Sequence, residues 1–417
     1  MNHSFNRPST LAALDIGSSK VCCLIAHVSK DKKIEIVGYG YNASHGIKNG
    51  IITDINQATL SVCNAVESAE QMANERISDV IINVSGEKTY SEILNNSISL
   101  HKSRPVNDSD IEKLINKISS RLNAPDKEII HNFSMNYRLD KGEPLKDPRQ
   151  IYGENLSLDL MVGLYPSILY KNLASAVDNA HLEISKKIFS AYASGLSCLV
   201  DDEKELGATI VDIGGGTTSI VTFANGFPVK FSTIPVGGNN ITNDIAWGLT
   251  TSFAHAEDLK NRHGCAFLIS QDKTELINVY PVGEEDDNSI KQIQKSDLIN
   301  IIIPRVEEIF EMVARKLEEH GLKNMTNHRV VLTGGCTQLS GIREVAALAL
   351  DKQVRIGIPR NIPNIPKNLY NPTYSVVLGM LLFGVHNNEL KTFKNNSRSN
   401  LDIGGFGKIF SWLQQNF

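Results

Sequence analysis

Hydrophobic residues follow two different periods along the chain, and each change of period marks an expected element. Residues 11–28 hold two apolar strands around a short polar loop, and residues 34–40 form a third apolar run after a turn. Residues 54–76 place apolar side chains at helical spacing, and a short buried strand is expected at 80–86. This part of the chain therefore predicts three strands, a helix and a fourth strand, the start of an α/β domain.

The same plan begins again near the middle of the chain. Residues 208–236 predict three more strands, and the last two are joined at Asn225-Gly226, a pair typical of type I′ turns. Repetition over such a length predicts a duplicated domain rather than a solenoid. Helices are expected over 239–249, 255–264 and 304–321, and a strand, a glycine turn and a helix over 328–348.

Each half is interrupted by a segment of different character. After Gly86 the sequence becomes more polar and predicts a capped helix at 107–119, a strand at 128–139 and a Pro- and Gly-rich loop at 140–153. The apolar strand at 157–166 is expected to return the chain to the first domain. The first insertion is thus predicted to be a small α+β subdomain.

These changes of pattern give the boundaries of the expected units. A linker is assigned where the sequence becomes rich in Asn and Ser and loses its apolar periodicity. The first domain is expected over 10–86, 157–199 and 371–385, with its insertion over 87–156. The second domain is expected over 206–236 and 304–370, with its insertion over 237–303. A flexible linker is expected over 386–403, and an amphipathic helix over 404–417.

Composition narrows the class of protein without changing this picture. The 417 residues are 41% hydrophobic and 21% charged, as in soluble globular proteins, and the net charge of −4 argues against nucleic-acid binding. The six cysteines show no C-x-x-C spacing, which favours reduced thiols in the cytosol. The N-terminus lacks the apolar stretch of a signal peptide, and the late apolar segment at 376–385 is too short to span a membrane.

Two loops carry the candidate chemistry, one in each half. Neither has the spacing of a dinucleotide-binding loop or a P-loop. If they face each other across a cleft, Asp15 and Asp212 would hold Mg²⁺ partly through water, and Lys20 would reach the outer phosphates of a nucleotide. The glycines would let the backbone approach phosphate oxygens, and the hydroxyls would donate to them. The candidate residues are Asp15, Gly17, Ser18, Ser19, Lys20, Asp212, Gly214, Gly215, Gly216, Thr217 and Thr218.

Four further residues are candidates for the rest of a nucleotide. Gly334 and Gly335, between a strand and a helix, would offer a flat surface to adenine. Glu257 and Lys260, three apart on one helix, would reach the ribose and base. Either loop alone is a weak signal because turn glycines are common, but the whole set in this order favours a nucleotide and metal site. A plain turn hydroxyl remains the alternative for Ser18, Ser19 and Thr218.

This constellation resembles the actin-like ATPase superfamily over nearly all of residues 10–385. The small-residue helices expected at 191–199 and 371–384 look like the pair that crosses at the hinge of that superfamily, where close backbones need small side chains. The insertion after Gly86, rather than after the third strand, is similar to the FtsA family of bacterial cell-division proteins. Strings typical of that family also occur at 137–148, 241–249, 256–266, 330–342, 353–359 and 374–381.

The resemblance implies a fold, a cofactor and a limit on activity. It implies an α/β fold of duplicated actin-like (ribonuclease-H-like) domains around a nucleotide cleft that binds ATP and Mg²⁺. In this superfamily an acidic or amide residue often positions the attacking water at the start of the first hinge helix, where this chain has Ser190 and Ala191. A hydroxyl is a poor base at neutral pH. ATP binding is therefore better supported than hydrolysis, and no catalytic residue is assigned.

The tail and one arginine are candidate partner sites. Residues 404–417 are too short to span a bilayer but suit an interfacial helix. The resemblance implies that this helix targets the protein to the membrane. The alternative is a helix that docks on the chain's own core. Arg305, within a string that matches the family at 301–309, is the candidate for binding the C-terminal peptide of the tubulin-like FtsZ. A surface salt bridge with a neighbouring glutamate is its alternative. The candidate membrane residues are Phe406, Ile409, Phe410, Trp412, Leu413 and Phe417.

The sequence thus predicts an ATP-binding, self-associating protein that anchors FtsZ filaments to the cytoplasmic face of the bacterial inner membrane at the division septum. Other division proteins are expected as partners, and nucleic acid is not. Two other functions stay open at this point. A small-molecule kinase of the same superfamily would need a catalytic base in the cleft, and a pilus-assembly adaptor of the same fold would lack the amphipathic tail.

Overall fold

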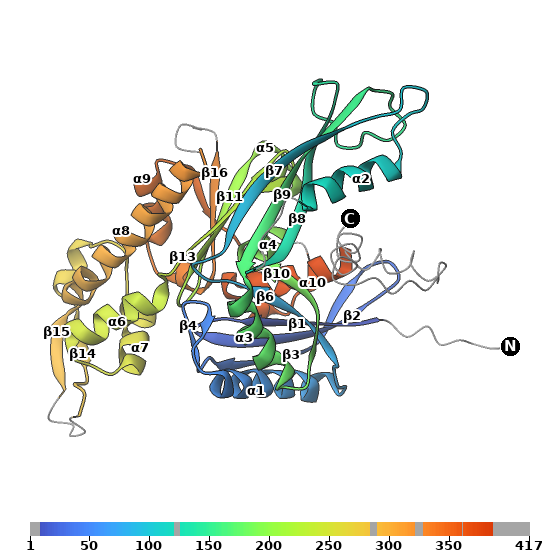
Figure 1. Cartoon of the computed structure of the whole chain (residues 1–417). Helices are drawn as coiled ribbons and strands as arrows, with labels where there is room; N and C mark the ends of the chain where they lie inside the picture. The colour runs from blue at the N-terminus through green and yellow to red at the C-terminus, as the bar shows by residue number, and fades with distance from the viewer. Residues whose placement is uncertain (1–8, 121–125, 284–289, 322–327, 361, 387–417) are drawn as a thin grey trace.

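The computed structural model describes residues 9–120, 126–283, 290–321, 328–360 and 362–386. A five-stranded sheet lies below an eight-stranded sheet in the view of Figure 1. The strand order of the first sheet is β10 (Glu183–Phe189), β6 (Asp79–Val84), β1 (Ser9–Ile16), β2 (Lys20–Val28) and β3 (Ile34–Ala43). That of the second is β17 (Val354–Ile356), β16 (Arg329–Thr333), β11 (Ala208–Ile213), β12 (Thr218–Ala224), β13 (Phe227–Ile234), β7 (Tyr90–Ser99), β9 (Asn155–Pro166) and β8 (Lys127–Leu139).

Both halves begin with the same strand pairing. In the first half, β1 pairs antiparallel with β2 and parallel with β6. In the second half, β11 pairs antiparallel with β12 and parallel with β16. Asp15 and Asp212 each lie one residue before the end of their strand. Asn225 and Gly226 have φ angles of 52° and 84°, as a type I′ turn requires. The predicted duplication is therefore confirmed.

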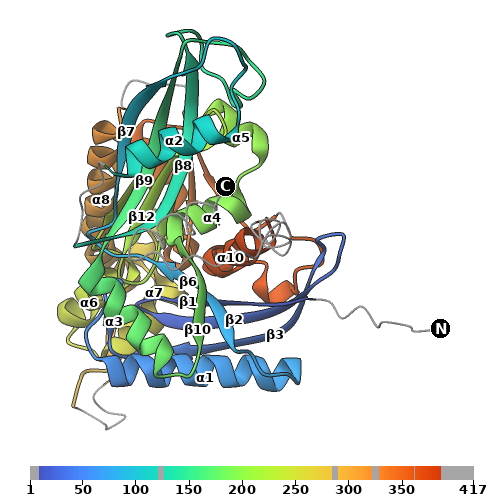
Figure 2. The same ribbon diagram turned by 45° about the vertical axis from the view of Figure 1, so that its right-hand side comes forward.

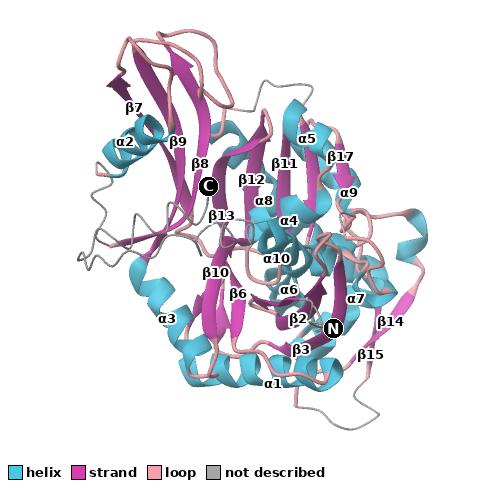
Figure 3. Cartoon of the chain, turned by 90° about the vertical axis from the view of Figure 1, so that its right-hand side faces the viewer, coloured by secondary structure: helices cyan, strands magenta, loops and turns pink. Residues whose placement is uncertain are grey.

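Helix α1 (Ile55–Ala73) covers one face of the first sheet, as Figure 3 shows. It begins after Asp54, whose side chain accepts a hydrogen bond from a backbone N–H of the first turn. The helix packs closely on β3 because Gly40 has no side chain; a Cβ there would collide with the Ala65 carbonyl oxygen. Helix α3 (Ser167–Asp178) packs beside α1.

Two small-residue helices cross between the halves, in line with the predicted hinge pair. Helices α4 (Ser190–Cys198) and α10 (Ser375–His386) lie next to each other in Figures 1 and 2. Their backbones approach so closely that a Cβ at Gly379 would collide with the Ala193 carbonyl group. Helix α10 is buried along almost its whole length, which explains why it is apolar on every side.

The first insertion contains β7, α2 (Asp108–Ser119), β8 and β9. Asn107 and Asp110 form the capping box that starts α2. The strand that we expected to rejoin the first domain does not do so, because β9 pairs along its length with β7 and β8. Leu158 and Leu160 of β9 share a buried cluster with apolar side chains of α2. The apolar run at 157–166 thus completes the core of the insertion instead of a domain sheet.

Helix α8 (Lys295–Glu319) is longer than predicted, with Pro304 inside it rather than at its start. Leu298, Ile299 and Ile302 in the added turns are buried in the core of the second half. This burial outweighs the hydrogen bond that an internal proline removes. The other elements are β4 (Ile47–Lys48), β5 (Ile51–Ile52), α5 (Asp201–Leu206), α6 (Gly238–Leu249), α7 (Phe253–His263), η1 (Ser270–Lys273), β14 (Leu276–Val279), β15 (Lys291–Gln294), η3 (Gly335–Gln338), α9 (Ile342–Leu350), η4 (Lys367–Leu369) and η5 (Pro372–Tyr374).

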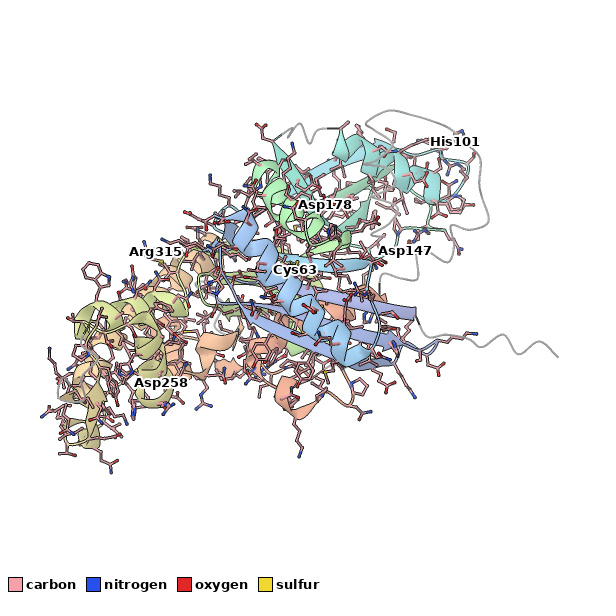
Figure 4. The ribbon with its side chains drawn as sticks, turned by 90° about the horizontal axis from the view of Figure 1, so that it is seen from below. Cys63, His101, Asp147, Asp178, Asp258 and Arg315 are labelled. Carbon is pink, nitrogen blue, oxygen red and sulfur yellow. The ribbon has the colours of Figure 1, made fainter. Side chains whose placement is uncertain are left out.

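The two insertions lie at opposite ends of the molecule. Figure 4 shows α1 with Cys63 across the middle, His101 and Asp147 of the first insertion toward one end, and Asp258 of α7 toward the other. Among the helices of the described residues, none is long and apolar enough to cross a membrane. The linker and terminal helix expected after His386 lie outside the described residues.

Candidate nucleotide-binding site

A cavity of about 620 Å³ lies where the loops of the two halves meet. Every predicted nucleotide-binding residue except Thr218 lines it. The Thr218 hydroxyl donates to the Val236 carbonyl oxygen at 2.8 Å and is buried, so it holds strand β12 instead of facing the cavity. The structure thus brings together two loops that are far apart in the sequence.

The two aspartate loops have the same internal geometry and touch each other. Each is closed by one hydrogen bond, from Gly17 N to Lys20 O at 3.0 Å and from Gly214 N to Thr217 O at 2.9 Å. Side chains at the next two glycines would contact the facing loop, with a Cβ at Gly215 lying 2.6 Å from Ser19 Cβ. A Cβ at Gly216 would lie 2.8 Å from Ser18 Cβ. These two glycines therefore let the loops close on one another.

Asp15 is buried at the end of β1 and held by an amide side chain. Asn83 Nδ2 donates to Asp15 Oδ1 at 2.7 Å and to Ser190 Oγ at 3.1 Å, and Asn83 Oδ1 accepts from Ile16 N at 2.7 Å. Burial raises the pKa of Asp15 to about 6, and the charge of Lys20 limits the rise. The carboxylate is thus fixed in position but costly to ionise without a cation.

Asp212 is the matching carboxylate of the second half. Its Oδ2 accepts a hydrogen bond from Ser194 Oγ. Burial raises the pKa of Asp212 to about 7, opposed by that hydrogen bond and reinforced by the charge of Asp15. Gly334, with φ of 90°, passes so close that a Cβ there would collide with Asp212 Oδ1. Only glycine suits this position, both for its conformation and for its proximity to the carboxylate.

Lys20 supplies positive charge at the same cavity. Its Nζ donates to the Thr373 carbonyl oxygen at 3.1 Å and lies 3.8 Å from the centre of the Tyr374 ring. Burial lowers the pKa of Lys20. In the described residues, no group of three or more His, Cys, Asp or Glu side chains could hold a metal ion. A divalent ion at Asp15 and Asp212 would therefore complete its shell with water and phosphate oxygens.

Glu257 and Lys260 form one polar cluster on α7, and both line the same cavity as Gly334 and Gly335. Lys260 Nζ donates to Glu257 Oε2 at 2.6 Å and to Thr242 Oγ1 at 2.7 Å. Burial opposes ionisation of Glu257, but the charge of Lys260 and the hydrogen bonds outweigh it and lower the pKa of Glu257. The other carboxylate oxygen, Oε1, accepts a hydrogen bond from Asn261 Nδ2 at 3.3 Å, so the Glu257 carboxylate is held in place where it lines the cavity.

Arg305 lies outside this cavity, on α8. Its guanidinium makes two hydrogen bonds to Asp244 of α6, at 2.6 and 3.0 Å, and one to Glu308 of its own helix. The neighbouring glutamate of the salt-bridge alternative is thus present, together with an aspartate that the sequence did not suggest. The candidate membrane residues of the tail lie outside the described residues.

Sequence reasoning missed one cavity residue, Asn83, and one neighbouring helix position, Ser194. Asn83, Ser190 and Ser194 form the polar contacts that hold the two aspartates, although Ser190 was noted as a departure from an expected acid. The signal for Asn83 was a polar side chain inside an otherwise apolar strand. Its pairing beside β1, which brings it to Asp15, became visible only with the sheet order.

Duplicated halves with matched aspartate loops, a shared cavity and crossing hinge helices define an actin-like protein. Among solved structures, the PilM-PilN type IV pilus biogenesis complex is 15% identical, with a TM-score of 0.64, over 90% of this chain and 98% of that one. MreB5 of Spiroplasma citri bound to ADP is 14% identical, with a TM-score of 0.52, over 93% and 99%. At such identities the likeness shows the fold alone.

The sequence comparisons define the family. Residues 209–379 match the family described as "Cell division protein FtsA", and residues 86–162 match "SHS2 domain inserted in FTSA". The FtsA of Agrobacterium fabrum is 34% identical over 99% of this chain and 96% of its own length. That of Escherichia coli K12 is 30% identical over 98% of both. The chain belongs to the FtsA family and is a cell-division protein, so the kinase and pilus alternatives are less well supported.

Proposed function

We propose that the cavity binds ATP with Mg²⁺. The observation that carries this proposal is the pair of buried aspartates, one from each of two matched loops, which face a single cavity with a lysine beside them. Two buried carboxylates near one ammonium group leave negative charge that a divalent cation would compensate. Bound Mg²⁺ would neutralise phosphate charge, while Lys20 and the loop N–H groups bind phosphate oxygens.

We assign the base and ribose to the part of this cavity that is lined by α7 and by the glycine turn after β16. Gly334 and Gly335 leave backbone surface without side chains, and Glu257 offers a carboxylate held by Lys260. Carboxylates commonly bind ribose hydroxyl groups as hydrogen-bond acceptors. Adenosine would thus contact these residues, and the phosphates would contact the aspartate loops.

Hydrolysis is proposed to be slow or absent. Ser190 Oγ accepts from Asn83 and donates to the Val84 carbonyl oxygen at 3.3 Å, so the hydroxyl is already engaged. Such a group has no capacity to act as a general base at neutral pH. Turnover at the roughly 10 per second that is typical of enzymes would contradict this assignment.

The test of the nucleotide site is a calorimetric titration with ATP, in Mg²⁺ and in EDTA. Asp212→Ala should weaken binding strongly in Mg²⁺ and much less in EDTA, because it removes a metal-directed carboxylate. Asp178→Ala, at an exposed position of α3 that does not line the cavity, is the matched control. Unchanged Mg-ATP binding in Asp212→Ala would refute the site.

We also propose that the protein self-associates and links FtsZ to the cytoplasmic face of the inner membrane. Family membership supports the division role, and Arg305 with the terminal segment 404–417 supplies candidate contacts. Near Arg305, the Trp247 side chain of α6 is 87% exposed, three residues after Asp244. An exposed aromatic residue beside an arginine suits a peptide that carries apolar and acidic groups.

A further inference from the structure

Lys20, in the nucleotide cavity, is held by two groups that carry no charge. Its Nζ donates to the Thr373 carbonyl oxygen at 3.1 Å and lies 3.8 Å from the centre of the Tyr374 ring. An ammonium group within about 6 Å of an aromatic centroid is attracted by the electron-rich face of the ring. The carbonyl oxygen and the ring therefore orient the ammonium group without placing another negative charge beside it.

Both groups belong to the short segment that leads into a hinge helix. This segment, η5 (Pro372–Tyr374), directly precedes α10. It is fixed to the second half, because Thr373 Oγ1 accepts a hydrogen bond from Gln338 Nε2 at 2.8 Å. Asn371 caps it, since its Oδ1 accepts from Thr373 N at 2.8 Å. Lys20, on β2 of the first half, is thus held by a segment that is anchored in the second half.

A lysine that binds phosphate gains from being held in advance. The four-carbon stem of lysine is flexible, and its rotamer freedom is lost when the ammonium group is fixed on a ligand. If the side chain is already ordered in the unliganded protein, binding no longer causes that loss, and the affinity rises. Lys20 lines the cavity and Tyr374 does not, so an effect of the Tyr374 ring on a ligand must pass through the lysine.

We propose that Tyr374 is a positioning residue for phosphate binding. Its ring, together with the Thr373 carbonyl oxygen, holds the Lys20 ammonium group at the cavity wall before a nucleotide arrives. This role rests on the proposed ATP site and adds to it a residue outside the two aspartate loops. It also connects the phosphates to the start of a hinge helix, because the segment that orients Lys20 continues directly into α10.

Calorimetric titration of the full chain with ATP and Mg²⁺ tests the role of the ring. Tyr374→Leu removes the ring and keeps an apolar side chain at a partly buried position, and it should weaken binding roughly five- to tenfold. Tyr374→Phe keeps the ring and should bind like the parent protein. Tyr370→Leu, at a tyrosine that is 52% exposed and does not line the cavity, is the matched control and should also bind like the parent.

The same titration in Lys20→Met separates positioning from general support of the fold. Methionine keeps a long unbranched side chain without the charge, so no ammonium group is left to position. Adding Tyr374→Leu to Lys20→Met should then change the affinity by less than about twofold. Asn371→Ala, which removes the hydrogen bond to Thr373 N, should likewise weaken ATP binding only when Lys20 is present. This second variant keeps the test decisive if Tyr374→Leu does not fold.

Three results would overturn the proposal. An equal loss of affinity with Lys20 and with Lys20→Met would show that the ring supports the cleft and not the lysine. Unchanged or tighter binding in both Tyr374→Leu and Asn371→Ala would show that the segment does not prepare Lys20 for phosphate. No binding of ATP by the parent protein would reject the proposed nucleotide site, and the positioning role with it. The first two results leave the nucleotide site standing, so the two failures are distinguishable.

Discussion

At the scale of single residues, the two buried aspartates make the stability of the unliganded protein depend on pH. Burial raises the pKa of Asp15 to about 6 and of Asp212 to about 7. Below the ordinary aspartate pKa of 3.8, both carboxyl groups are protonated in the folded and in the unfolded chain, so folding does not have to bury their negative charges. As pH rises through about 7 the unliganded fold must bury two charges, and this contribution to stability is lost.

Asp212→Asn tests this dependence. The amide oxygen can accept the same Ser194 hydrogen bond, and the charge is gone. In EDTA the variant should unfold several degrees above the wild type at pH 8 and at nearly the same temperature at pH 4. Thermal unfolding followed by circular dichroism measures both. Asp258→Asn on α7 is the control, and an equal difference at both pH values would contradict the titration of a buried carboxylate.

Residue types were easier to predict than residue neighbours. The aspartates, glycines and Lys20 could be assigned from two short strings because the chemistry of phosphate and metal binding restricts which side chains serve it. Thr218 was included wrongly among the cavity residues, since alternation along a strand turns it away. Asn83 and Ser194 were missed because their contacts depend on sheet order and on how α4 packs, which one sequence does not contain.

At the scale of elements, the contact between α6 and α8 holds the candidate FtsZ site. Arg305 of α8 is bound by Asp244 of α6, so a peptide carboxylate must replace an existing partner. Arg305 is also only about one quarter exposed. The pair therefore allows a test that separates a binding role from a structural one.

Two charge-removing variants should change binding of the FtsZ C-terminal peptide in opposite directions. Arg305→Gln should weaken it by roughly tenfold, as expected for loss of a charge-assisted contact of about 1.5 kcal/mol. Asp244→Asn should strengthen it, because the guanidinium then has one competitor fewer. Fluorescence anisotropy of a labelled peptide measures both. If both variants weaken binding equally, the ion pair only supports the two helices.

Element boundaries were mispredicted where an apolar run of sequence is compatible with more than one place in the fold. The run in β9 has the pattern of a buried domain strand, yet its partners are β7 and β8. Pro304 was taken as a helix start, although buried isoleucines before it extend α8. Both errors arose because tertiary contacts outweigh local signals. The hairpins and the hinge helices were predicted correctly because glycines and small residues there have few alternatives.

At the scale of the whole molecule, the proposed membrane attachment would depend on one short segment, residues 404–417. Each large apolar side chain contributes roughly 1.5–3 kcal/mol when fully buried, and burial at an interface is only partial. One copy should therefore bind weakly, and self-association should strengthen attachment by avidity. Salt should matter little, because residues 404–417 contain the single lysine Lys408.

Phe410→Glu should release the protein from vesicles, because it forces a charge into the apolar face of the tail. Ser411→Glu, the same charge on the polar face, is the matched control and should bind nearly as well as the wild type. Sedimentation with vesicles measures the bound fraction. Equal loss in the two variants would show that net charge, not the apolar face, governs attachment.

The joint between the first insertion and the second half has a consequence for assembly. The eight-stranded sheet passes from β13 to β7 through a single residue pair, Ser232 and Tyr90. This one pair leaves most of the facing backbone of β13 and β7 outside the ladder of strand pairing. Within the described chain, the outermost strands of this sheet are β17, of three residues, and β8, of thirteen, in which Tyr137 also pairs with Leu145. Of these two outermost strands, β8 is the one long enough to serve as a template for a strand donated by a neighbouring molecule, over the residues that precede Tyr137.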